Sequence, residues 1–551
     1  MKKTIQFLVI VLNIITLSLN AQTMVKDIRS GGYGSRPDRF ISMGTTLFFV
    51  ADTSITGNSR QLWKTDGTSI GTSLVSDKIL SNGGVSMGMV TMGGYLYFTA
   101  YDGVARELYK TDGTMAGTVM VKDIGSGMYG SNPSELVVYN GNLYFYADDG
   151  INGYELWKSD GTTGGTFMVK DIRPGQYGSI NTSYQTKLVA MNNMLYFSAW
   201  DGGLGNHILW KTDGTANGTV EVKTDGSITY PEDLFEYNGT LYFSAQDVGG
   251  IVGRELYKSD GTDAGTILLK DIHTGNYNSS NPNQFTVANN ILFFAAYDDA
   301  YNFELWKTDG TASGTIKVKE INPSTSGGLI APVSNLTNCN SNLFFPAKES
   351  VNGTELWKSD GTTNGTVLVK DIVPGTGNSD PINLVEMNNI LYFSGGIVNN
   401  MQVGNIGAEL WKSDGTQAGT VLVKDIWPGV YSSSPVGLFN HNGILFFSAN
   451  DGVHGSELWK YDPNVIGIYE NDQNNKNFDL FPNPTNDYLT IKNNTGDINT
   501  TYALLNSLGQ QILTGKLTGE TTRVDVTKLP SGLYFMQVGD EEKQTFKVMK
   551  K

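Results

Sequence analysis

One short pattern, Leu followed by Trp or Tyr and then Lys, recurs nine times along the chain and restricts the folds open to it. Successive copies stand 46 to 54 residues apart. Their Leu residues occupy positions 62, 108, 156, 209, 256, 305, 356, 410 and 458. A repeat of this length indicates one supersecondary unit per copy, stacked on its neighbours, rather than a series of unrelated domains.

Each copy lies among four short segments with the composition of β-strands. In one unit they are residues 135–139, 142–147, 154–159 and 166–172. They are rich in Val, Tyr, Phe, Leu and Trp, and Asn-Gly, Asp-Gly or Gly-Thr turns separate them, which is typical of antiparallel hairpins. The 66 glycines fit an all-β chain with many tight turns. Four antiparallel strands in ~45 residues is the period of a β-propeller blade.

The two ends of the repeat region are incomplete in complementary ways. Residues 23–28, "TMVKDI", have the sequence of a fourth strand without the three before it. Residues 457–463, "ELWKYDP", have the sequence of a third strand without a fourth. The N-terminal strand can therefore pair with the last three strands and close a ring, whereas an open solenoid would need capping units. The sequence predicts a closed β-propeller of about nine four-stranded blades.

The lengths of the connections predict which face of the propeller carries function. From the Leu of the pattern to the apolar residue before the next Lys-Asp, the distance is 13 residues in all eight complete units, and this stretch contains the turn "DGTxxGT". The turn between the first and second strands is also short, as at Asn140–Gly141. The second-to-third and fourth-to-next connections vary instead, over landmark distances of 12 to 19 and 19 to 26 residues. Both variable connections emerge on the opposite face, where binding residues are expected.

The acidic residues of the repeat are predicted to be structural. Glu precedes Leu-Trp or Leu-Tyr at Glu107, Glu155, Glu255, Glu304, Glu355, Glu409 and Glu457. A single reaction centre does not need seven equivalent carboxylates, and no "DxDxDG" calcium loop is present. We expect the Asp of each Asp-Gly-Thr turn to cap its turn, and the third-strand Trp or Tyr to pack between blades.

Aromatic residues of the variable connections are the first candidates for ligand contact. After "KDI" the loop often reads Gly-x-Tyr-x-Ser, which gives Tyr33, Tyr129, Tyr177, Tyr277 and Tyr431. A tyrosine offers apolar area with a polar tip for stacking on a sugar or contacting a protein. The alternative is that each ring fixes its own loop to the blade edge, and the regular recurrence of the tyrosine favours this alternative. Residues that interrupt the repeat are further candidates. These are Trp200, Trp427, His454, Arg106, Arg254, His207 and His273.

Composition disfavours several functional classes. A net charge of −15 argues against binding to nucleic acid. The single cysteine, Cys339, excludes an internal disulfide, and with only four histidines we expect neither a metal nor a cofactor. No phosphate loop or "HExxH" motif is present. An active site assembled from scattered loops would leave no such motif, so an enzyme stays an alternative.

Residues 1–21 have the pattern of a secretory signal peptide. A basic Lys2–Lys3 start precedes an apolar stretch, and the small Ala21 stands before Gln22. An uncleaved membrane anchor is the alternative, although polar residues such as Asn13 interrupt the apolar run. No other segment is long and apolar enough to span a bilayer, so the mature chain is expected to be exported without a transmembrane helix.

The pattern changes after Pro463. Residues 464–477 are polar and rich in Asn, which is typical of a linker. Residues 478–551 alternate apolar residues with short turns, which predicts a small β-sandwich. The expected organisation is therefore a signal peptide (1–21), a propeller (22–463), the linker and the sandwich.

The C-terminal region resembles a known family. It contains "FPNPT", "NSLGQ" and "LPSGLYFMQV" in this order, followed by a basic end. The motif residues are Phe481, Pro482, Asn483, Pro484, Gly509, Gly532 and Tyr534. They resemble the type A C-terminal sorting domain of the type IX secretion system of Bacteroidetes. The resemblance implies a signal read by the type IX machinery for crossing the outer membrane. That signal is usually removed as the cargo is released or attached to surface lipopolysaccharide.

The repeats in turn resemble the ELWxxDGT-repeat family of exported bacterial proteins, over nearly all of residues 23–462. The departures "QLWKTDGT" (61–68) and "ILWKTDGT" (208–215) leave the expected fold unchanged. This resemblance implies no biochemical activity. We predict a secreted or cell-surface binding or adhesion propeller whose variable loops take an unknown glycan or protein. The alternatives are a polysaccharide- or peptide-degrading enzyme with its site at the channel mouth, and a purely structural surface-layer protein.

Overall fold

The computed structural model describes residues 22–54, 60–81, 88–125, 130–181, 187–203, 206–300, 302–322, 335–396, 407–464, 477–495, 500–506, 510–539 and 544–551. Over these ranges the chain is all-β, with strands and no helix. Accordingly, the described part contains no helix that could cross a membrane. The chain forms two compact units, one of residues 24–461 and one of residues 1–23 with 462–551.

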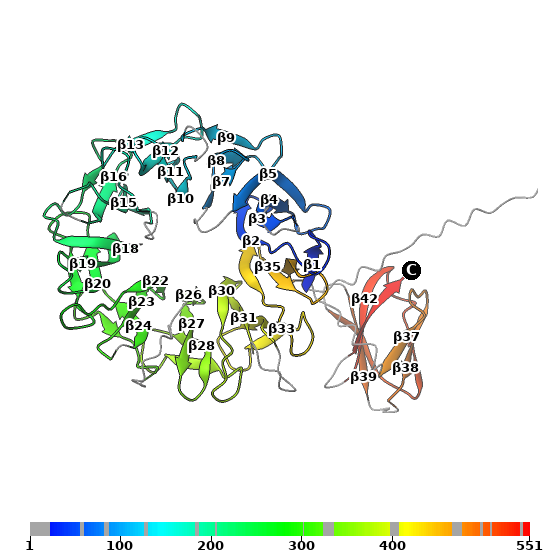
Figure 1. The fold of residues 1–551 in the computed structure, drawn as a ribbon. Coiled ribbons are helices and arrows are strands. Elements are labelled where there is room, and N and C mark those ends of the chain that lie inside the picture. The colour runs from blue at the N-terminus through cyan, green and yellow to red at the C-terminus, as the bar shows by residue number, and fades with distance from the viewer. Residues whose placement is uncertain are drawn as a thin grey trace, which may run out of the picture. The chain divides into compact units, whose positions relative to one another are not determined.

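The first unit consists of antiparallel sheets whose strands follow chain order (Figure 1). An eight-stranded sheet contains β2 (Asp38–Met43), β3 (Thr46–Asp52), β4 (Arg60–Thr65), β5 (Ser73–Ser81), β6 (Met89–Met92), β7 (Tyr95–Tyr101), β8 (Arg106–Thr111) and β9 (Val119–Lys122). Its two halves join where β5 pairs with β7. Each half has the same four-strand order as the sheets that follow.

The following sheets have four strands each. They are β10 (Ser134–Tyr139), β11 (Asn142–Asp148), β12 (Tyr154–Ser159) and β13 (Phe167–Lys170); β14 (Val189–Met191), β15 (Met194–Ala199), β16 (Ile208–Thr212) and β17 (Val220–Glu221); β18 (Ile228–Tyr237), β19 (Thr240–Asp247), β20 (Arg254–Ser259) and β21 (Ile267–Lys270); β22 (Asn283–Ala288), β23 (Ile291–Tyr297), β24 (Phe303–Thr308) and β25 (Ile316–Lys317); β26 (Thr337–Cys339), β27 (Asn342–Glu349), β28 (Gly353–Ser359) and β29 (Val367–Lys370); and β30 (Ile382–Met387), β31 (Ile390–Gly395), β32 (Glu409–Ser413) and β33 (Val421–Lys424).

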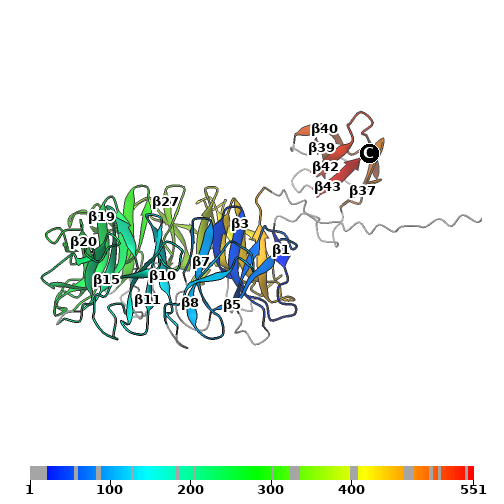
Figure 2. The same cartoon turned by 90° about the horizontal axis from the view of Figure 1, so that it is seen from above.

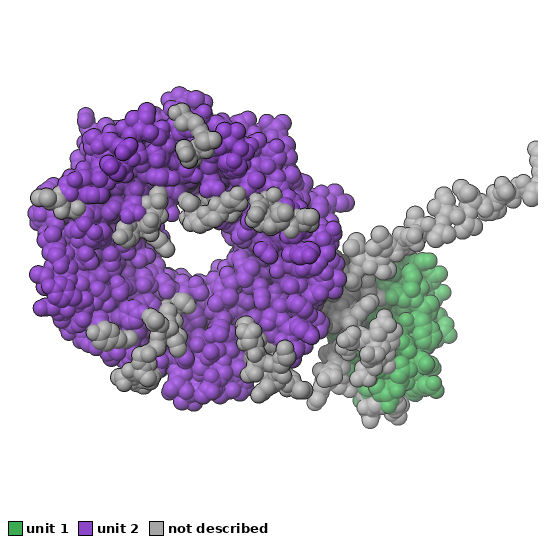
Figure 3. Space-filling view, in the orientation of Figure 1, with its two compact units in different colours: residues 1–23, 462–551 green, residues 24–461 purple. Residues whose placement is uncertain are grey.

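The last sheet joins the two ends of this unit. It contains β34 (Val436–His441), β35 (Ile444–Asn450), β36 (Ser456–Tyr461) and, beside β36, the first strand β1 (Gln22–Lys26). The carboxylate of Glu457 accepts hydrogen bonds from the backbone N–H groups of Arg29 (3.2 Å) and Ser35 (2.8 Å). In Figure 1 the sheets follow one another around a ring, Figure 2 shows this unit edge-on, and Figure 3 shows an opening through its middle.

Apolar side chains fill the space between neighbouring sheets. One cluster combines Tyr144 and Leu156 of one sheet with Phe197 and Trp210 of the next. The third-strand tryptophans are buried throughout, with exposed fractions of 4% to 9%. Burying an aromatic side chain of this size contributes about 2 kcal/mol or more. The predicted packing role of these residues is confirmed.

The Asp-Gly-Thr turns are built from the same hydrogen bonds in every complete unit. The carboxylate of Asp160 accepts from the backbone N–H (2.8 Å) and the hydroxyl (2.7 Å) of Thr162. The Gly165 N–H donates to the Thr162 hydroxyl at 3.0 Å. The other seven turns repeat all three bonds within 0.1 Å of these distances. The constant length of this turn therefore reflects a fixed internal geometry.

The second unit contains two sheets around one core. One has β37 (Phe478–Phe481), β38 (Tyr488–Asn493) and β41 (Thr521–Asp525), and the other has β40 (Gln511–Lys516), β39 (Thr501–Asn506), β42 (Gly532–Val538) and β43 (Gln544–Lys550). Leu489 and Ile491 from the first sheet share a buried cluster with Leu504, Met536 and Val548 from the second. Two sheets on one core is the arrangement of a β-sandwich.

Candidate functional site

The connections of each sheet leave from two opposite edges. In the sheet of β10 to β13, the turns 140–141 and 160–166 lie at one edge and the loops 149–153 and 171–180 at the other, because antiparallel strands alternate in direction. The two longer loops touch, since a Cβ atom on Gly153 would lie 2.3 Å from the backbone nitrogen of Gly178. We call the side of the ring with the constant-length turns, such as 140–141 and 160–166, the turn face and the other side the variable-loop face.

The seven repeated glutamates hold the loops of the variable-loop face in place. All seven are fully buried. Glu155 accepts hydrogen bonds from the backbone N–H of Ile172 (3.3 Å) and the hydroxyl of Ser179 (2.6 Å). Equivalent loop serines bond five of the other six glutamates, namely Ser35 to Glu457, Ser131 to Glu107, Ser280 to Glu255, Ser379 to Glu355 and Ser433 to Glu409. Glu304 accepts from the backbone N–H groups of Ile321 and Asn322, both at 3.2 Å. The predicted structural role of these carboxylates is confirmed.

Burial raises the pKa of these glutamates, because desolvation disfavours the charged carboxylate. It raises the pKa to about 7 in five of them, against the opposing effect of their hydrogen bonds. These are Glu155, Glu255, Glu304, Glu355 and Glu409. A perturbed carboxyl is a candidate for acid–base catalysis. Here each carboxyl group is hydrogen-bonded to the backbone of the loop that it anchors. The raised pKa is therefore explained by the buried anchoring position and does not by itself indicate catalysis.

The anchoring serine was missed by sequence reasoning. The Gly-x-Tyr-x-Ser pattern drew attention to its tyrosine, although the serine recurs as regularly. A buried carboxylate needs donors close by, and a serine 24 or 25 residues after the glutamate in five units is the signal that could have identified these pairs.

Four of the five predicted loop tyrosines lie in the described residues, and all four are exposed. The exposed fractions are 72% for Tyr33, 74% for Tyr177, 71% for Tyr277 and 56% for Tyr431. Tyr129 lies outside the described residues. This exposure leaves both interpretations, ligand contact and fixing of the loop, as predictions.

Neighbouring side chains orient three of these rings. The Arg29 guanidinium lies 5.1 Å from the centre of the Tyr33 ring, and that of Arg173 lies 5.2 Å from the centre of Tyr177. The Tyr431 ring stacks on Trp427, with ring centres 5.1 Å apart. Such contacts restrain the rings while most of each ring faces solvent, which is the geometry of a preformed stacking platform.

Trp200 joins one of these groups. Its ring centre lies 3.8 Å from the Arg173 guanidinium, on the opposite loop to Tyr177. His207 is buried, and this burial, with the nearby charge of Arg173, lowers its pKa. The structure thus brings Tyr177, Trp200 and His207 together around Arg173, a residue that sequence reasoning did not single out.

A second group forms around Trp427. The loop of Gly452 approaches it, since a Cβ atom on this glycine would lie 2.6 Å from the Trp427 indole. His454 follows on the same loop, and its Nδ1 lies 2.7 Å from the carboxylate of Asp451. The hydrogen bond to Asp451 raises the pKa of His454. Trp427, Tyr431 and the loop of His454 are therefore neighbours.

The strands nearest the opening in Figure 1 carry a repeated bulge. In β10 the pairing with β11 shifts between Ser134 and Val137, and the bulged Glu135 has a left-handed φ of 51°. Bulged residues with the same backbone are Arg39, Asp233, Gln284 and Asn383. Burial raises the pKa of Glu135 and of Asp233, against the charge of Lys187. Arg254, another repeat-breaking residue, pairs with Glu232 at 3.2 Å.

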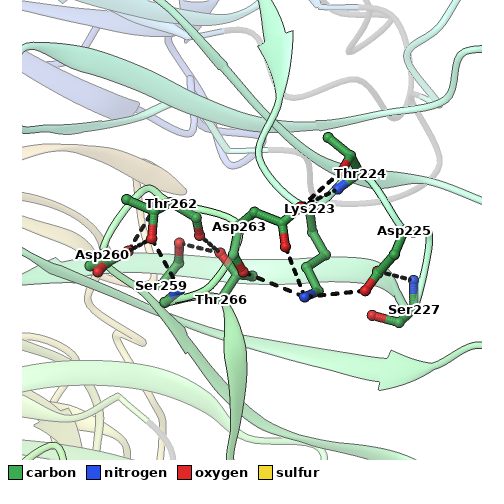
Figure 4. Close-up of polar contacts among 10 residues, drawn as sticks. Lys223, Thr224, Asp225, Ser227, Ser259, Asp260, Thr262, Asp263 and Thr266 are labelled. Carbon is green, nitrogen blue, oxygen red and sulfur yellow. Dashed lines mark hydrogen bonds and ion pairs between the residues drawn. The ribbon is translucent and has the colours of Figure 1, made fainter.

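Lysines after the fourth strands bridge neighbouring sheets. The Lys170 ammonium donates to the Thr219 carbonyl at 2.8 Å. Lys223 instead lies 3.0 Å from the Asp263 carboxylate and 3.2 Å from that of Asp225 (Figure 4). The N–H of Thr224 and then the Lys223 ammonium lower the pKa of Asp263 to about 2. Exposed ion pairs of this kind add little stability. We therefore interpret the contact of Lys223 with Asp263 as a surface link between neighbouring sheets and not as a functional site.

Chemistry based on metals or thiols finds no support in the described ranges. No group of three or more His, Cys, Asp or Glu side chains there is placed to hold a metal ion. Cys339 is buried, and burial raises the pKa of its thiol to about 11. A buried thiol of this pKa is a poor nucleophile at neutral pH.

The described sorting-motif residues lie in or directly after β37 and in β42 of the second unit. Phe481 is half-exposed and precedes Pro482 and Pro484, while the Asn483 carboxamide oxygen accepts from the Met549 N–H at 2.9 Å. Tyr534 is buried, and its hydroxyl donates to the Pro530 carbonyl at 2.9 Å. Gly532 begins β42. Gly509 lies outside the described residues.

The family described as "Secretion system C-terminal sorting domain" matches residues 479–551. This match confirms the predicted type IX sorting domain and shows that the protein is exported, to the cell surface or as a secreted protein. No curated protein matches the chain.

Among solved structures, a puromycin hydrolase is 13% identical, with a TM-score of 0.36, and the match covers 68% of this chain and 60% of the hydrolase. A puromycin-hydrolyzing peptidase of Mycobacterium tuberculosis is 12% identical, with a TM-score of 0.37 and coverage of 76% and 60%. PorZ, a surface component of the type-IX secretion system of Porphyromonas gingivalis, is 12% identical, with a TM-score of 0.35 and coverage of 93% and 75%. At these TM-scores the likenesses carry no functional argument.

Proposed function

We propose that residues 22–463 form a closed β-propeller of nine four-stranded blades, in which β1 completes the last blade. The pairing of β1 with β36 and the ring of sheets in Figure 1 support this proposal. The resemblance to ELWxxDGT repeats agrees with it. Residues 1–21 would be the cleaved signal peptide, residues 464–477 the linker and residues 478–551 the sorting domain.

The sorting domain directs the propeller out of the cell. Deleting residues 478–551 should leave the protein in the periplasm of its host, because the type IX signal is then missing. Fractionation with an antibody against the propeller tests this. Normal surface delivery of the truncated chain would contradict the assignment.

On this scaffold we propose a non-enzymatic binding or adhesion protein whose variable-loop face takes an extracellular glycan. One observation carries the proposal: four tyrosines at equivalent loop positions are 56% to 74% exposed, and they stand on loops held by buried glutamates. Aromatic rings on separate loops suit a ligand with many similar apolar faces. A protein interface needs one continuous desolvated core.

Glycan arrays and pull-downs with the full chain test the binding proposal. We expect array signals for one class of polysaccharide, and removal of all four tyrosines should abolish them. A protein captured without any glycan signal would replace the glycan by a protein ligand. Silence in both assays would contradict a binding function and favour a structural surface-layer protein.

Hydrolysis is the second candidate function. Glu135 and Asp233 have pKa values raised by burial on strands near the opening, and Lys187 acts on both. A pair of carboxyl groups is the usual machinery for cleaving glycosidic bonds. Release of reducing sugar that is lost in Glu135→Gln would favour this function, and its absence on a polysaccharide that binds would exclude it for that polymer.

A further inference from the structure

Two arginines occupy the same position in two loops of the variable-loop face. Arg29 and Arg173 each follow the "KDI" segment. Each guanidinium donates to the carbonyl of a loop glycine, Gly34 at 3.4 Å or Gly178 at 3.5 Å. Each also lies 5.1–5.2 Å from the centre of an exposed tyrosine ring. The two loops are therefore a matched pair within one chain.

The residue that faces the arginine differs between the two loops. Asp52 and Trp200 stand at equivalent positions, since their N–H groups donate to Ser35 and Ser179, the two anchoring serines. Arg29 lies 4.0 Å from the buried Asp52 carboxylate. Arg173 instead lies 3.8 Å from the ring centre of Trp200. A carboxylate has been replaced by an indole.

Among the described residues, this replacement leaves the charge of Arg173 without an acidic ion-pair partner. Over the described ranges no Asp or Glu oxygen forms an ion pair with it, whereas nine other ion pairs are formed there. In the sequence, residues 182–186 and 204–205, which lie outside these ranges, include no Asp or Glu. The net charge of the chain is −15, so most of its cationic groups can find acidic partners. A guanidinium that stacks on aromatic rings and has no such partner among the described residues is a candidate anion-binding site.

We propose that Arg173, Trp200 and Tyr177 form a subsite for a carboxylate-bearing sugar, such as a uronic acid residue of a polysaccharide. The Arg173 guanidinium binds the sugar carboxylate, which supplies the negative charge that Asp52 supplies to Arg29 in the matched loop. The exposed faces of Tyr177 and Trp200 stack on the apolar face of the sugar ring. This inference rests on the proposed glycan-binding function and names its ligand class.

The matched loop explains why the proposal is confined to one site. Tyr33 is as exposed as Tyr177, at 72% against 74%, but its arginine is neutralised internally. The Arg29 loop can stack a sugar and has no free charge for an acidic one. It therefore serves as an internal control.

The test measures affinity of the full chain for polygalacturonate, alginate and hyaluronan, each beside its carboxyl methyl ester. We expect at least one free acid to bind, and its ester to bind tenfold or more weakly, because a charge-assisted hydrogen bond is lost. Arg173→Gln and Tyr177→Ala should weaken binding of the acid similarly, and Ile70→Ala, at an exposed position of the turn face, should not. Trp200→Asp rebuilds the Asp52 arrangement and should abolish binding. Urea midpoints verify that each variant is folded.

Several results would overturn the proposal. They are equal binding of acid and ester, no effect of Arg173→Gln, binding to none of the three polymers, or equal competition by poly-glutamate. Signals for neutral glycans with none for acidic ones would reject this subsite while leaving the proposed glycan-binding function standing. Silence toward every glycan would reject both.

Discussion

The turn face and the variable-loop face differ in what their repeats share. On the turn face the same three hydrogen bonds recur in all eight complete turns, and both partners belong to the same turn. On the variable-loop face the anchoring glutamate recurs, but the residues displayed beside it change. Arg29 meets Asp52, Arg173 meets Trp200, and Trp427 meets Tyr431. The repeated turns and anchoring glutamates therefore maintain the scaffold, while the residues that differ between repeats lie on the variable-loop face.

The largest effect should come from removing a loop anchor. Glu155→Ala leaves the Ser179 hydroxyl and two backbone N–H groups without their acceptor, which should lower the free energy of unfolding by about 3 kcal/mol. Urea unfolding of the full chain measures it. Asp77→Ala, which removes a highly exposed carboxylate, is the control and should change stability by less than about 0.5 kcal/mol. Equal effects would contradict the anchoring role.

A second prediction concerns how uniformly the equivalent turns of the turn face contribute to stability. Thr166, Thr266 and Thr366 are buried, and each hydroxyl bonds the preceding strand's serine at 2.7 Å. Replacing any one by Val should cost about 1 kcal/mol through the loss of a buried hydrogen bond. The three variants should agree closely. A spread as large as the effect itself would break the claim that the turn face is uniform.

The anchors also predict a dependence on pH. A glutamate whose pKa is about 7 when folded and near 4.5 when unfolded favours folding in its protonated form. Its contribution is complete below pH 4.5 and disappears as the pH rises through 7. Unfolding should therefore need more urea at pH 5 than at pH 8. The difference should shrink in Glu155→Gln, which does not titrate; an unchanged difference would disconnect the pH effect from this residue.

The smallest effect on stability is expected at the displayed residues. Tyr277→Ala should change the free energy of unfolding by no more than about 0.5 kcal/mol, because the side chain is 71% exposed. Thermal or urea unfolding beside the Thr266→Val variant provides the comparison. A loss greater than that of Thr266→Val would show that the tyrosine fixes its loop after all.

Much of the fold could be predicted because strand composition and turn residues are local signals. The predicted segment 154–159 coincides with β12, and 135–139 differs from β10 by one residue. The predicted fourth strand, 166–172, extends beyond β13 at both ends. Thr166 belongs to the turn through its bond to the Thr162 carbonyl, and Ile172 leaves the sheet to reach Glu155.

The candidate site was less predictable, because it depends on contacts between loops of different sheets. Trp200 was noticed as a departure from the repeat, but its neighbour Arg173 was not, since nothing in either segment indicates the other. The exposure of the tyrosines also could not be predicted from the sequence. The same sequence pattern would be compatible with a buried tyrosine ring. The orientation of the ring depends on how the hydrogen bond between Ser179 and Glu155 holds the loop.

We expect ligands to bind the variable-loop face and not the turn face. One paired glycan-array measurement can decide between the two faces. It compares the full chain with a variant in which Tyr33, Tyr177, Tyr277 and Tyr431 are replaced by Ala. The matched control replaces Ile70 and Met115, which are exposed on the turns, by Ala. We predict that the tyrosine variant loses the array signal at least tenfold while the turn variant keeps it. A signal that survives the tyrosine substitutions, or falls with the turn substitutions, would contradict the account.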